Sequence, residues 1–209
     1  MTAQPGAAQF VPDTSGLAEL RAAAASCKGC DLWRHATQTV FGEGPAPAGL
    51  MLVGEQPGDR EDLEGHPFVG PAGHVLDTAL ERAGIDRSRV YLTNAVKHFR
   101  FKERGKRRLH EKPTRSQIVA CQPWLRAEIE VVEPGLLVLM GAVAAQSLLG
   151  SDFSVMRRRG IVPDAPPGLP PVLATVHPSS ILRAPDDQRH ARMEEYVADL
   201  RAAAALLAR

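Results

Sequence analysis

Four short runs of apolar residues divide the chain, and each is bounded by glycine, proline or polar side chains. They cover residues 50–53, 89–96, 136–140 and 171–176. Continuous apolar runs of this length, flanked by turn-forming residues, are typical of strands that are buried on both faces of a parallel sheet. The pattern therefore predicts four buried strands.

The segments between and after these runs carry apolar residues at helical spacing. They predict helices over residues 71–83, 116–132, 141–149 and 190–208, and a short helix that ends near Cys27. Strand and helix thus alternate four times, which predicts a three-layer α/β/α sandwich around a central four-stranded, mainly parallel sheet. Ligands of such sheets bind at the carboxyl ends of the strands, so we expect a site there.

The length of 209 residues suits one domain. Residues 1–15 have no periodicity, so we expect a loose N-terminal arm followed by a single domain over 16–209. The chain has neither a run of 18 apolar residues nor the pattern of a secretory signal, so we expect no membrane partner. Three cysteines are too few for a disulfide framework.

The net charge of +1 hides a local asymmetry. The chain holds 25 basic and 24 acidic residues, but the segment 97–115 has nine basic residues and two acidic ones. This segment carries +7, and the rest of the chain therefore carries −6. A concentrated basic segment on an acidic domain predicts that a polyanion binds there.

A polar motif, GEQPGD, follows the first predicted strand at residues 54–59. It lacks the spacing of a phosphate-binding loop, and a plain strand-to-helix turn would explain its glycines and proline equally well. Glu55 favours a functional interpretation because a carboxylate at a strand end can orient a base or nucleophile. The amide of Gln56 can read the hydrogen-bonding edge of a planar ligand.

Two further side chains suit the recognition of a planar ligand. Phe68 lies in the segment GHPFVGPAG, where flanking glycines and prolines indicate a structured loop, although a core position is the commoner fate of phenylalanine. On such a loop it can stack on a flipped nucleobase. Asn94 follows the second strand, and its amide complements the pairing edge of a pyrimidine, although a structural cap is an alternative.

The sequence HPSS follows the fourth predicted strand. A lone histidine near a helix start is more often structural, but His177 can also stabilise negative charge on a departing base. The hydroxyls and backbone amides of Ser179 and Ser180 can hold a phosphate.

The cysteines form one close pair and one distant residue. Cys27 and Cys30 make a CxxC motif, and Cys121 lies far along the chain. A redox pair, a zinc site, an iron–sulfur site and three free buried thiols are all compatible with this pattern. His98, just after the second strand, is a candidate fourth ligand.

Taken together, these residues resemble the uracil-DNA glycosylase superfamily, specifically its family 4, iron–sulfur branch. The resemblance runs from about residue 20 to 205 and rests on CxxC, GE-x-PG, GxPFVGPAG, TNxVK, a later cysteine and HPSS. His98 stands where ordinary members have cysteine, Gln56 replaces a small residue, and a basic loop containing KRRLH is added at about 100–115. These departures resemble the UdgX subgroup, whose members excise uracil and then stay covalently joined to the abasic site through the loop histidine.

The resemblance implies a role for each motif. Phe68 stacks on the flipped uracil, Asn94 reads its pairing edge, and Gln56 and Asp59 line the pocket. His177 stabilises the charge that develops on the departing uracil. The implied ligands of a structural 4Fe–4S cluster are Cys27, Cys30, His98 and Cys121. The implied DNA-binding residues are Lys97, Lys106, Arg107, Arg108, Ser179 and Ser180.

His110, within KRRLH, is the implied nucleophile. Cleavage of the bond between C1′ and uracil leaves an oxocarbenium-like sugar, and a neutral imidazole on the same face can capture it in place of water. Glu55 can accept the second ring N–H and so keep the attacking nitrogen unprotonated. The alternative is that this segment is an ordinary solvent-exposed loop in which His110 has no catalytic role.

Three functions therefore remain open. The first is a uracil-DNA glycosylase that traps itself on DNA through His110. The alternatives are an ordinary turnover glycosylase and a non-catalytic protein that binds uracil-containing or damaged DNA. We expect a monomeric, cytoplasmic bacterial protein that joins the nucleoid when it binds uracil-containing DNA, single-stranded or double-stranded, and releases uracil.

Overall fold

The computed structural model describes residues 4–208 and has a five-stranded sheet at its centre. The strands lie in the order β2-β1-β5-β7-β6. Their bounds are Val90–Asn94 (β2), Leu50–Gly54 (β1), Leu136–Met140 (β5), Val172–Thr175 (β7) and Gly160–Ile161 (β6). The first four are parallel, as the apolar runs predict, and β6 adds an antiparallel edge.

The prediction of four strands is thus one strand short. The missing strand, β6, has only two residues, Gly160 and Ile161. A segment this short shows no hydrophobic period, so the sequence gives no signal for it.

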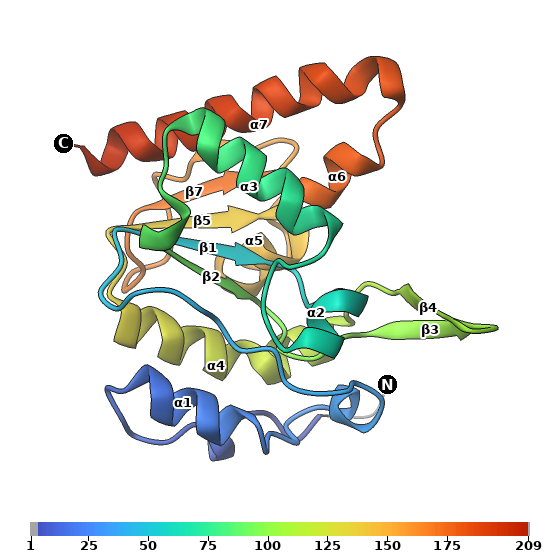
Figure 1. The fold of residues 1–209 in the computed structure, drawn as a ribbon. Helices are drawn as coiled ribbons and strands as arrows, with labels where there is room; N and C mark the ends of the chain where they lie inside the picture. Colours follow the sequence, from blue (N-terminus) through green and yellow to red (C-terminus); the bar gives the residue numbers. More distant parts are fainter. Residues whose placement is uncertain (1–3, 209) are drawn as a thin grey trace.

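Helices cover both faces of the sheet (Figure 1). One face carries α3 and α7, and the other carries α4 and α5, with α1 packed outside α4. The bounds are Leu17–Ala24 (α1), Pro71–Ala83 (α3), Arg115–Val132 (α4), Gly141–Leu149 (α5) and Asp186–Leu207 (α7). No helix within residues 4–208 combines the length and the apolar content that crossing a membrane requires.

The two faces of the sheet form two separate hydrophobic cores, and β1 contributes to both. Met51 and Val53 pack on the side of α4, whereas Leu50 and Leu52 pack on the side of α3 and α7. Successive side chains of a strand point to opposite faces, so a run that is apolar throughout serves both cores.

The basic segment expected as a loop is a β-hairpin. Strands β3 (Phe101–Arg104) and β4 (Arg107–His110) pair antiparallel, with Phe101 opposite His110. Gly105 has a φ of 60° in the two-residue turn, a conformation that favours glycine. The hairpin projects from the side of the molecule toward which the parallel strands point (Figure 1).

Two short helices at strand ends were expected only as turns. The GEQPGD motif leads into α2 (Asp59–Glu64), and HPSS forms the start of α6 (Pro178–Leu182). Each has six residues or fewer, too few to display a helical period.

The part of the N-terminal arm that the structure describes lies against the domain. The first three residues of the arm are outside the described part of the chain. Ala7 is buried, and its backbone N–H donates to Ala120 O at 2.8 Å. The N–H of Gly6 donates to Gly29 O at 2.8 Å. This part of the arm therefore packs on α4 and on the CxxC turn.

Candidate functional site

Three predicted site residues converge on Gly54, the last residue of β1. Gly54 pairs in register with Asn94 on β2. A methyl group placed on Gly54 would lie 2.4 Å from Asn94 Oδ1, 2.7 Å from Phe68 Cζ and 3.4 Å from His177 Nε2. The sheet edge therefore brings together an amide, an aromatic ring and an imidazole from three distant segments.

Phe68 is held in an unusual backbone conformation beside this point. Its φ is 58°, in the left-handed region that non-glycine residues rarely adopt. Gly73 supports the loop from α3, because a Cβ at Gly73 would lie 1.8 Å from Phe68 O. The ring of Phe68 is stacked with that of His177, with centroids 6.3 Å apart and planes at 28°. Such strain persists only where the surrounding structure fixes it and is common at ligand sites.

His177 is neutral at pH 7 and presents one nitrogen to the same point. Burial lowers its pKa to about 4. The backbone N–H of Ser179 donates to His177 Nδ1 at 3.2 Å, and the Ser179 hydroxyl lies 2.8 Å from the same atom. Nδ1 is therefore the acceptor, which places the ring proton on Nε2, the nitrogen that faces Gly54.

His110 and Glu55 lie near His177, since both act electrostatically on its imidazole. The His110 Nε2 atom is 3.3 Å from Glu55 Oε1, and the imidazole side chain is 50% exposed. Glu55 Oε1 is buried and has no hydrogen-bond partner among residues 4–208. An acceptor without a partner therefore faces a histidine that a large ligand can reach.

The side-chain amide of Gln56, which the resemblance places in the ligand pocket, is hydrogen-bonded to the backbone at the root of the hairpin. Its Nε2 donates to Arg100 O at 3.1 Å and to Glu111 O at 3.0 Å, and its Oε1 accepts from Arg100 N at 3.0 Å. The amide is therefore fully engaged with the backbone on both sides of the hairpin. Gln56 fixes the root of the hairpin.

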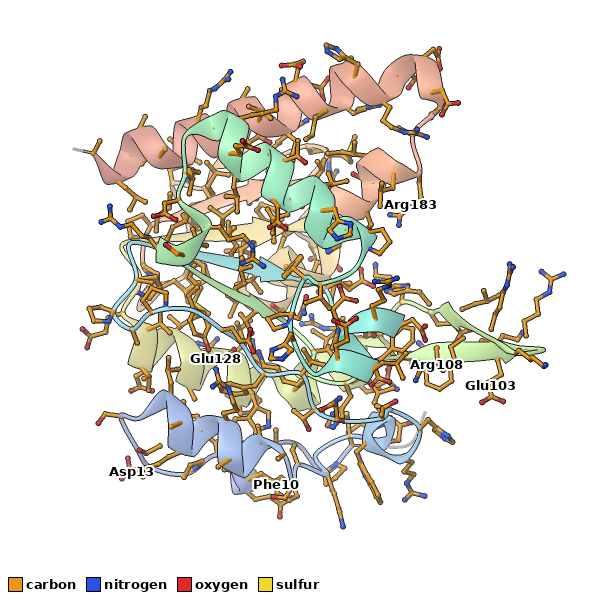
Figure 2. All side chains as sticks on the ribbon, in the orientation of Figure 1. Phe10, Asp13, Glu103, Arg108, Glu128 and Arg183 are labelled. Atoms are coloured by element: carbon orange, nitrogen blue, oxygen red, sulfur yellow. The ribbon has the colours of Figure 1, made fainter. Side chains whose placement is uncertain are left out.

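Arg108 and Asp59 also anchor the hairpin, although they were predicted to bind DNA and to line the pocket. Arg108 donates to Asp59 Oδ1 and to Asp62 Oδ2, each at 2.6 Å, and its side chain is 20% exposed. Figure 2 places Arg108 where the hairpin passes α2. Asp62 was missed by the sequence reasoning, and its three-residue spacing from Asp59 would have indicated a shared face had α2 been predicted.

Lys97 does not reach DNA, contrary to its predicted role. Its side chain is 1% exposed and forms an ion pair with Glu128 on α4, which is 0% exposed. Lys97 Nζ also donates to Thr93 Oγ1 and to Asn94 O, each at 2.7 Å. Lys97 therefore stabilises the end of β2 from within, directly beneath Asn94.

The outer part of the hairpin keeps its positive charge available. Four basic side chains there are exposed, and none has an ion-pair partner within the described chain: Lys102, Arg104, Lys106 and Arg107. The predicted phosphate-binding residues Lys106 and Arg107 belong to this group. Ser179 and Ser180 instead use their hydroxyls at His177, the latter donating to His177 O at 2.7 Å.

The three cysteines are buried and unbridged. Two of the sulfurs accept N–H groups: Cys27 Sγ from Trp124 Nε1 at 3.2 Å, and Cys121 Sγ from the Lys97 backbone at 3.3 Å. Burial raises the pKa of Cys30 to about 11, and electrostatic repulsion from Cys27 adds to this. The Cys30 thiol therefore needs a nearby cation to ionise.

His98 has the proton arrangement of a metal ligand. Burial lowers its pKa to about 4. Its Nε2 lies 2.9 Å from Thr39 Oγ1, which itself donates to Ala24 O at 2.9 Å. Nε2 therefore carries the proton and Nδ1 keeps a free lone pair. Within residues 4–208, no three His, Cys, Asp or Glu side chains are close enough to hold a single metal ion.

The sheet order, the cluster of side chains at Gly54 and the hairpin define an α/β protein with polar and aromatic groups gathered at the carboxyl ends of its parallel strands. The chain belongs to the uracil DNA glycosylase superfamily, whose family profile matches residues 41–201. The Type-4 uracil-DNA glycosylase of Archaeoglobus fulgidus is 34% identical over 182 residues, which cover 84% of this chain and 85% of the relative.

Two further relatives carry the same description. The Type-4 uracil-DNA glycosylase of Thermotoga maritima is 37% identical over 158 residues, covering 75% of this chain and 78% of the relative. That of Sulfurisphaera tokodaii is 39% identical over 133 residues, covering 62% of this chain and 57% of the relative. The chain thus spans little more than half of the latter protein.

Proposed function

We propose that this protein excises uracil from DNA and remains covalently attached to the resulting abasic site through His110. The observation that carries the proposal is the contact of 3.3 Å between His110 Nε2 and the otherwise unpartnered Glu55 Oε1, the residue next to Gly54. Relatives described as Type-4 uracil-DNA glycosylases support the choice of substrate.

Uracil recognition falls to Phe68 and Asn94. A base that is flipped out of the strand stacks on the ring of Phe68, and the Asn94 amide pairs with the base's O4 and N3–H. Glycine at position 54 lets Asn94 and Phe68 approach the end of β1 closely, because any side chain there would clash with both residues.

His177 assists departure of the base. As the bond between C1′ and N1 of uracil breaks, its electron pair moves onto the ring and the uracil oxygens. The Nε2–H of neutral His177 donates to the developing oxyanion. A neutral donor suits this role since its proton stays available across the physiological pH range.

His110 then captures the sugar. The lone pair of one ring nitrogen forms a bond to C1′, while Glu55 accepts the proton of the other nitrogen. The products are free uracil and an alkylated imidazole. Imidazole is a poor leaving group from this linkage, so the reaction stops after one turnover.

Four buried side chains would hold a 4Fe–4S cluster: Cys27, Cys30, His98 and Cys121. The cluster would act as a structural cross-link between the CxxC turn, the segment after β2 and α4. A brown protein that absorbs near about 400 nm supports this assignment, whereas a colourless protein contradicts it.

The test is a denaturing gel after incubation with a uracil-containing oligonucleotide. Wild-type protein yields a shifted band that survives heating. His110→Gly lacks that band and releases more than one uracil per protein, because water reaches C1′ in place of the imidazole.

A matched thymine oligonucleotide provides the negative control. Free abasic product in excess of wild-type protein, with no shifted band, would favour ordinary turnover. Binding without release of uracil would favour the non-catalytic alternative. An adduct that persists in His110→Gly would assign the nucleophile to another residue.

A further inference from the structure

A second aromatic side chain with basic neighbours lies outside the uracil pocket. Trp33 is 36% exposed at the surface, within the short helix η2 (Asp31–Arg34) that follows the CxxC turn. Lys28 Nζ lies 4.9 Å from the centre of its ring, and Arg34 Cζ lies 5.5 Å from it. We refer to Lys28, Trp33 and Arg34 as the Trp33 patch.

The two cations of the Trp33 patch are available to a ligand. Both are exposed, and neither has a carboxylate partner within residues 4–208. The nearest acid in sequence, Asp31, is engaged elsewhere, since its Oδ1 accepts from Gln4 Nε2 and Gln117 Nε2, each at 2.9 Å. The patch therefore combines an aromatic face with two uncompensated positive charges.

The η2 segment, which carries Trp33 and Arg34, lies next to the root of the hairpin. A surface pocket of about 280 Å³ is lined both by Asp31 and Leu32 of η2 and by Phe99, Arg100 and Phe101 at the root of the hairpin. Arg108 of the hairpin also donates to Thr37 Oγ1, just beyond η2, at 3.2 Å. A DNA strand whose phosphates bind the hairpin therefore passes close to the segment that carries Trp33.

We propose that the Trp33 patch binds the DNA strand flanking the uracil, with one base stacked on the indole and adjacent phosphates on Lys28 and Arg34. This inference rests on DNA being the substrate. Stacking on an exposed aromatic ring tolerates any base, so the patch adds affinity and reach without adding sequence preference. The long cationic side chains turn toward phosphates, which frees the ring face for the base.

Tryptophan fluorescence reads this contact directly. The chain has two tryptophans, and Trp124 is 0% exposed within the core. Fluorescence that iodide quenches therefore comes from Trp33. We expect a uracil-free oligothymidylate to quench this emission and to protect it from iodide. Binding of the oligothymidylate without either effect would overturn the proposal.

Variants separate stacking from charge. Trp33→Leu is expected to weaken binding of long oligothymidylate about fivefold or more, because stacking of one base contributes at least that factor. The Lys28→Gln, Arg34→Gln double variant is expected to reduce the slope of log affinity against log salt by about 1.4, since each single-strand phosphate contact contributes about 0.7. Arg192→Gln, which removes one exposed charge from α7 on the opposite face of the sheet, leaves the slope unchanged.

Strand length distinguishes this inference from the proposed function. The Trp33 variants keep the wild-type rate of uracil release on an oligonucleotide too short to extend beyond the hairpin, and lose affinity only as the flank is lengthened. Equal affinity of variants and wild type at every length would overturn the inference while leaving uracil excision intact. Absence of uracil release by wild type, with quenching retained, would overturn the proposed function instead. Thermal unfolding of Trp33→Leu controls for misfolding. The Lys28→Gln, Arg34→Gln variant, which retains the indole, provides a second measurement of how affinity depends on strand length.

Discussion

At the scale of single residues, the site depends on the absence of a side chain at Gly54. A side chain at this position would occupy the point where Asn94, Phe68 and His177 meet. The strained backbone of Phe68 holds its ring beside Gly54, and the His177 Nε2–H is directed to the same position. The convergence of Phe68, Asn94 and His177 could be predicted from motifs at strand ends, but the close packing at Gly54 could not, because one glycine among 18 carries no distinguishing signal.

Gly54→Ala is expected to abolish uracil release while the protein remains folded. The added methyl group would lie 2.4 Å from Asn94 Oδ1 and 2.7 Å from Phe68 Cζ, so both side chains proposed to bind the base would be displaced. The measurement is the single-turnover rate of uracil release. Gly49→Ala, just before the same strand, is the control, because its methyl group would meet only Leu207 at 3.9 Å. A Gly54→Ala variant as active as this control would show that the base binds elsewhere.

His177 is expected to make stability depend on pH. Its pKa is lowered by burial from 6.5 to about 4 in the folded protein. Between these values the unfolded chain binds a proton that the folded chain does not, so the free energy of unfolding falls as pH drops from about 6.5 to about 4. The slope from this one group approaches about 1.4 kcal/mol per pH unit. Urea unfolding of wild type and His177→Asn at pH 7 and pH 5 tests this, and an identical loss of stability in both would contradict it.

At the scale of elements, the hairpin is fixed to the domain at defined points. Gln56 holds its two ends, and Arg108 ties β4 to α2. The basic character of this segment was evident from the sequence, but its strands were not. Lysine and arginine obscure the alternating pattern of a hairpin whose two faces are both largely exposed. The charge count also overstated the DNA-binding surface, since Lys97 and Arg108 are neutralised by acids distant in sequence.

Gln56→Ala is expected to slow adduct formation more than it weakens DNA binding. Loss of three hydrogen bonds frees the root of the hairpin, so His110 spends less time beside C1′. We expect a decrease in the adduct rate of about tenfold or more. The Lys106→Gln, Arg107→Gln double variant at the turn should show the opposite effect. Its DNA affinity should fall, whereas its rate of adduct formation at saturating DNA should be nearly normal. Equal effects of the two changes on rate and affinity would contradict the anchoring role.

At the scale of the whole molecule, a buried ion pair joins the sheet to α4. Glu128 accepts from Lys97, from Thr93 Oγ1 and from Tyr91 OH, and Lys97 also donates to Asn94 O. The parallel sheet and its helices could be predicted because their apolar runs are long. The ion pair between Lys97 and Glu128 could not be predicted, because nothing in the sequence distinguishes Lys97 from the exposed lysine and arginine residues that follow it. Only packing places it inside.

Glu128→Ala is expected to lower the free energy of unfolding by about 3–5 kcal/mol, because it leaves the ammonium of Lys97 buried without a counter-charge. Chemical denaturation measures the change. Glu130→Ala, at an exposed position on the same helix, should stay within about 0.5 kcal/mol of wild type. Similar values for the two variants would mean that Lys97 is not confined to the interior.

In the proposed reaction, one protein molecule removes one uracil and stays bonded to the DNA. Mixing the protein with an excess of uracil-containing oligonucleotide, while released uracil and the intact mass of the protein are followed together, tests this most simply. If His110 captures the sugar, release stops at one uracil per protein, and the protein gains the mass of the oligonucleotide minus uracil. Continued release of uracil from protein of unchanged mass would show that no covalent adduct forms.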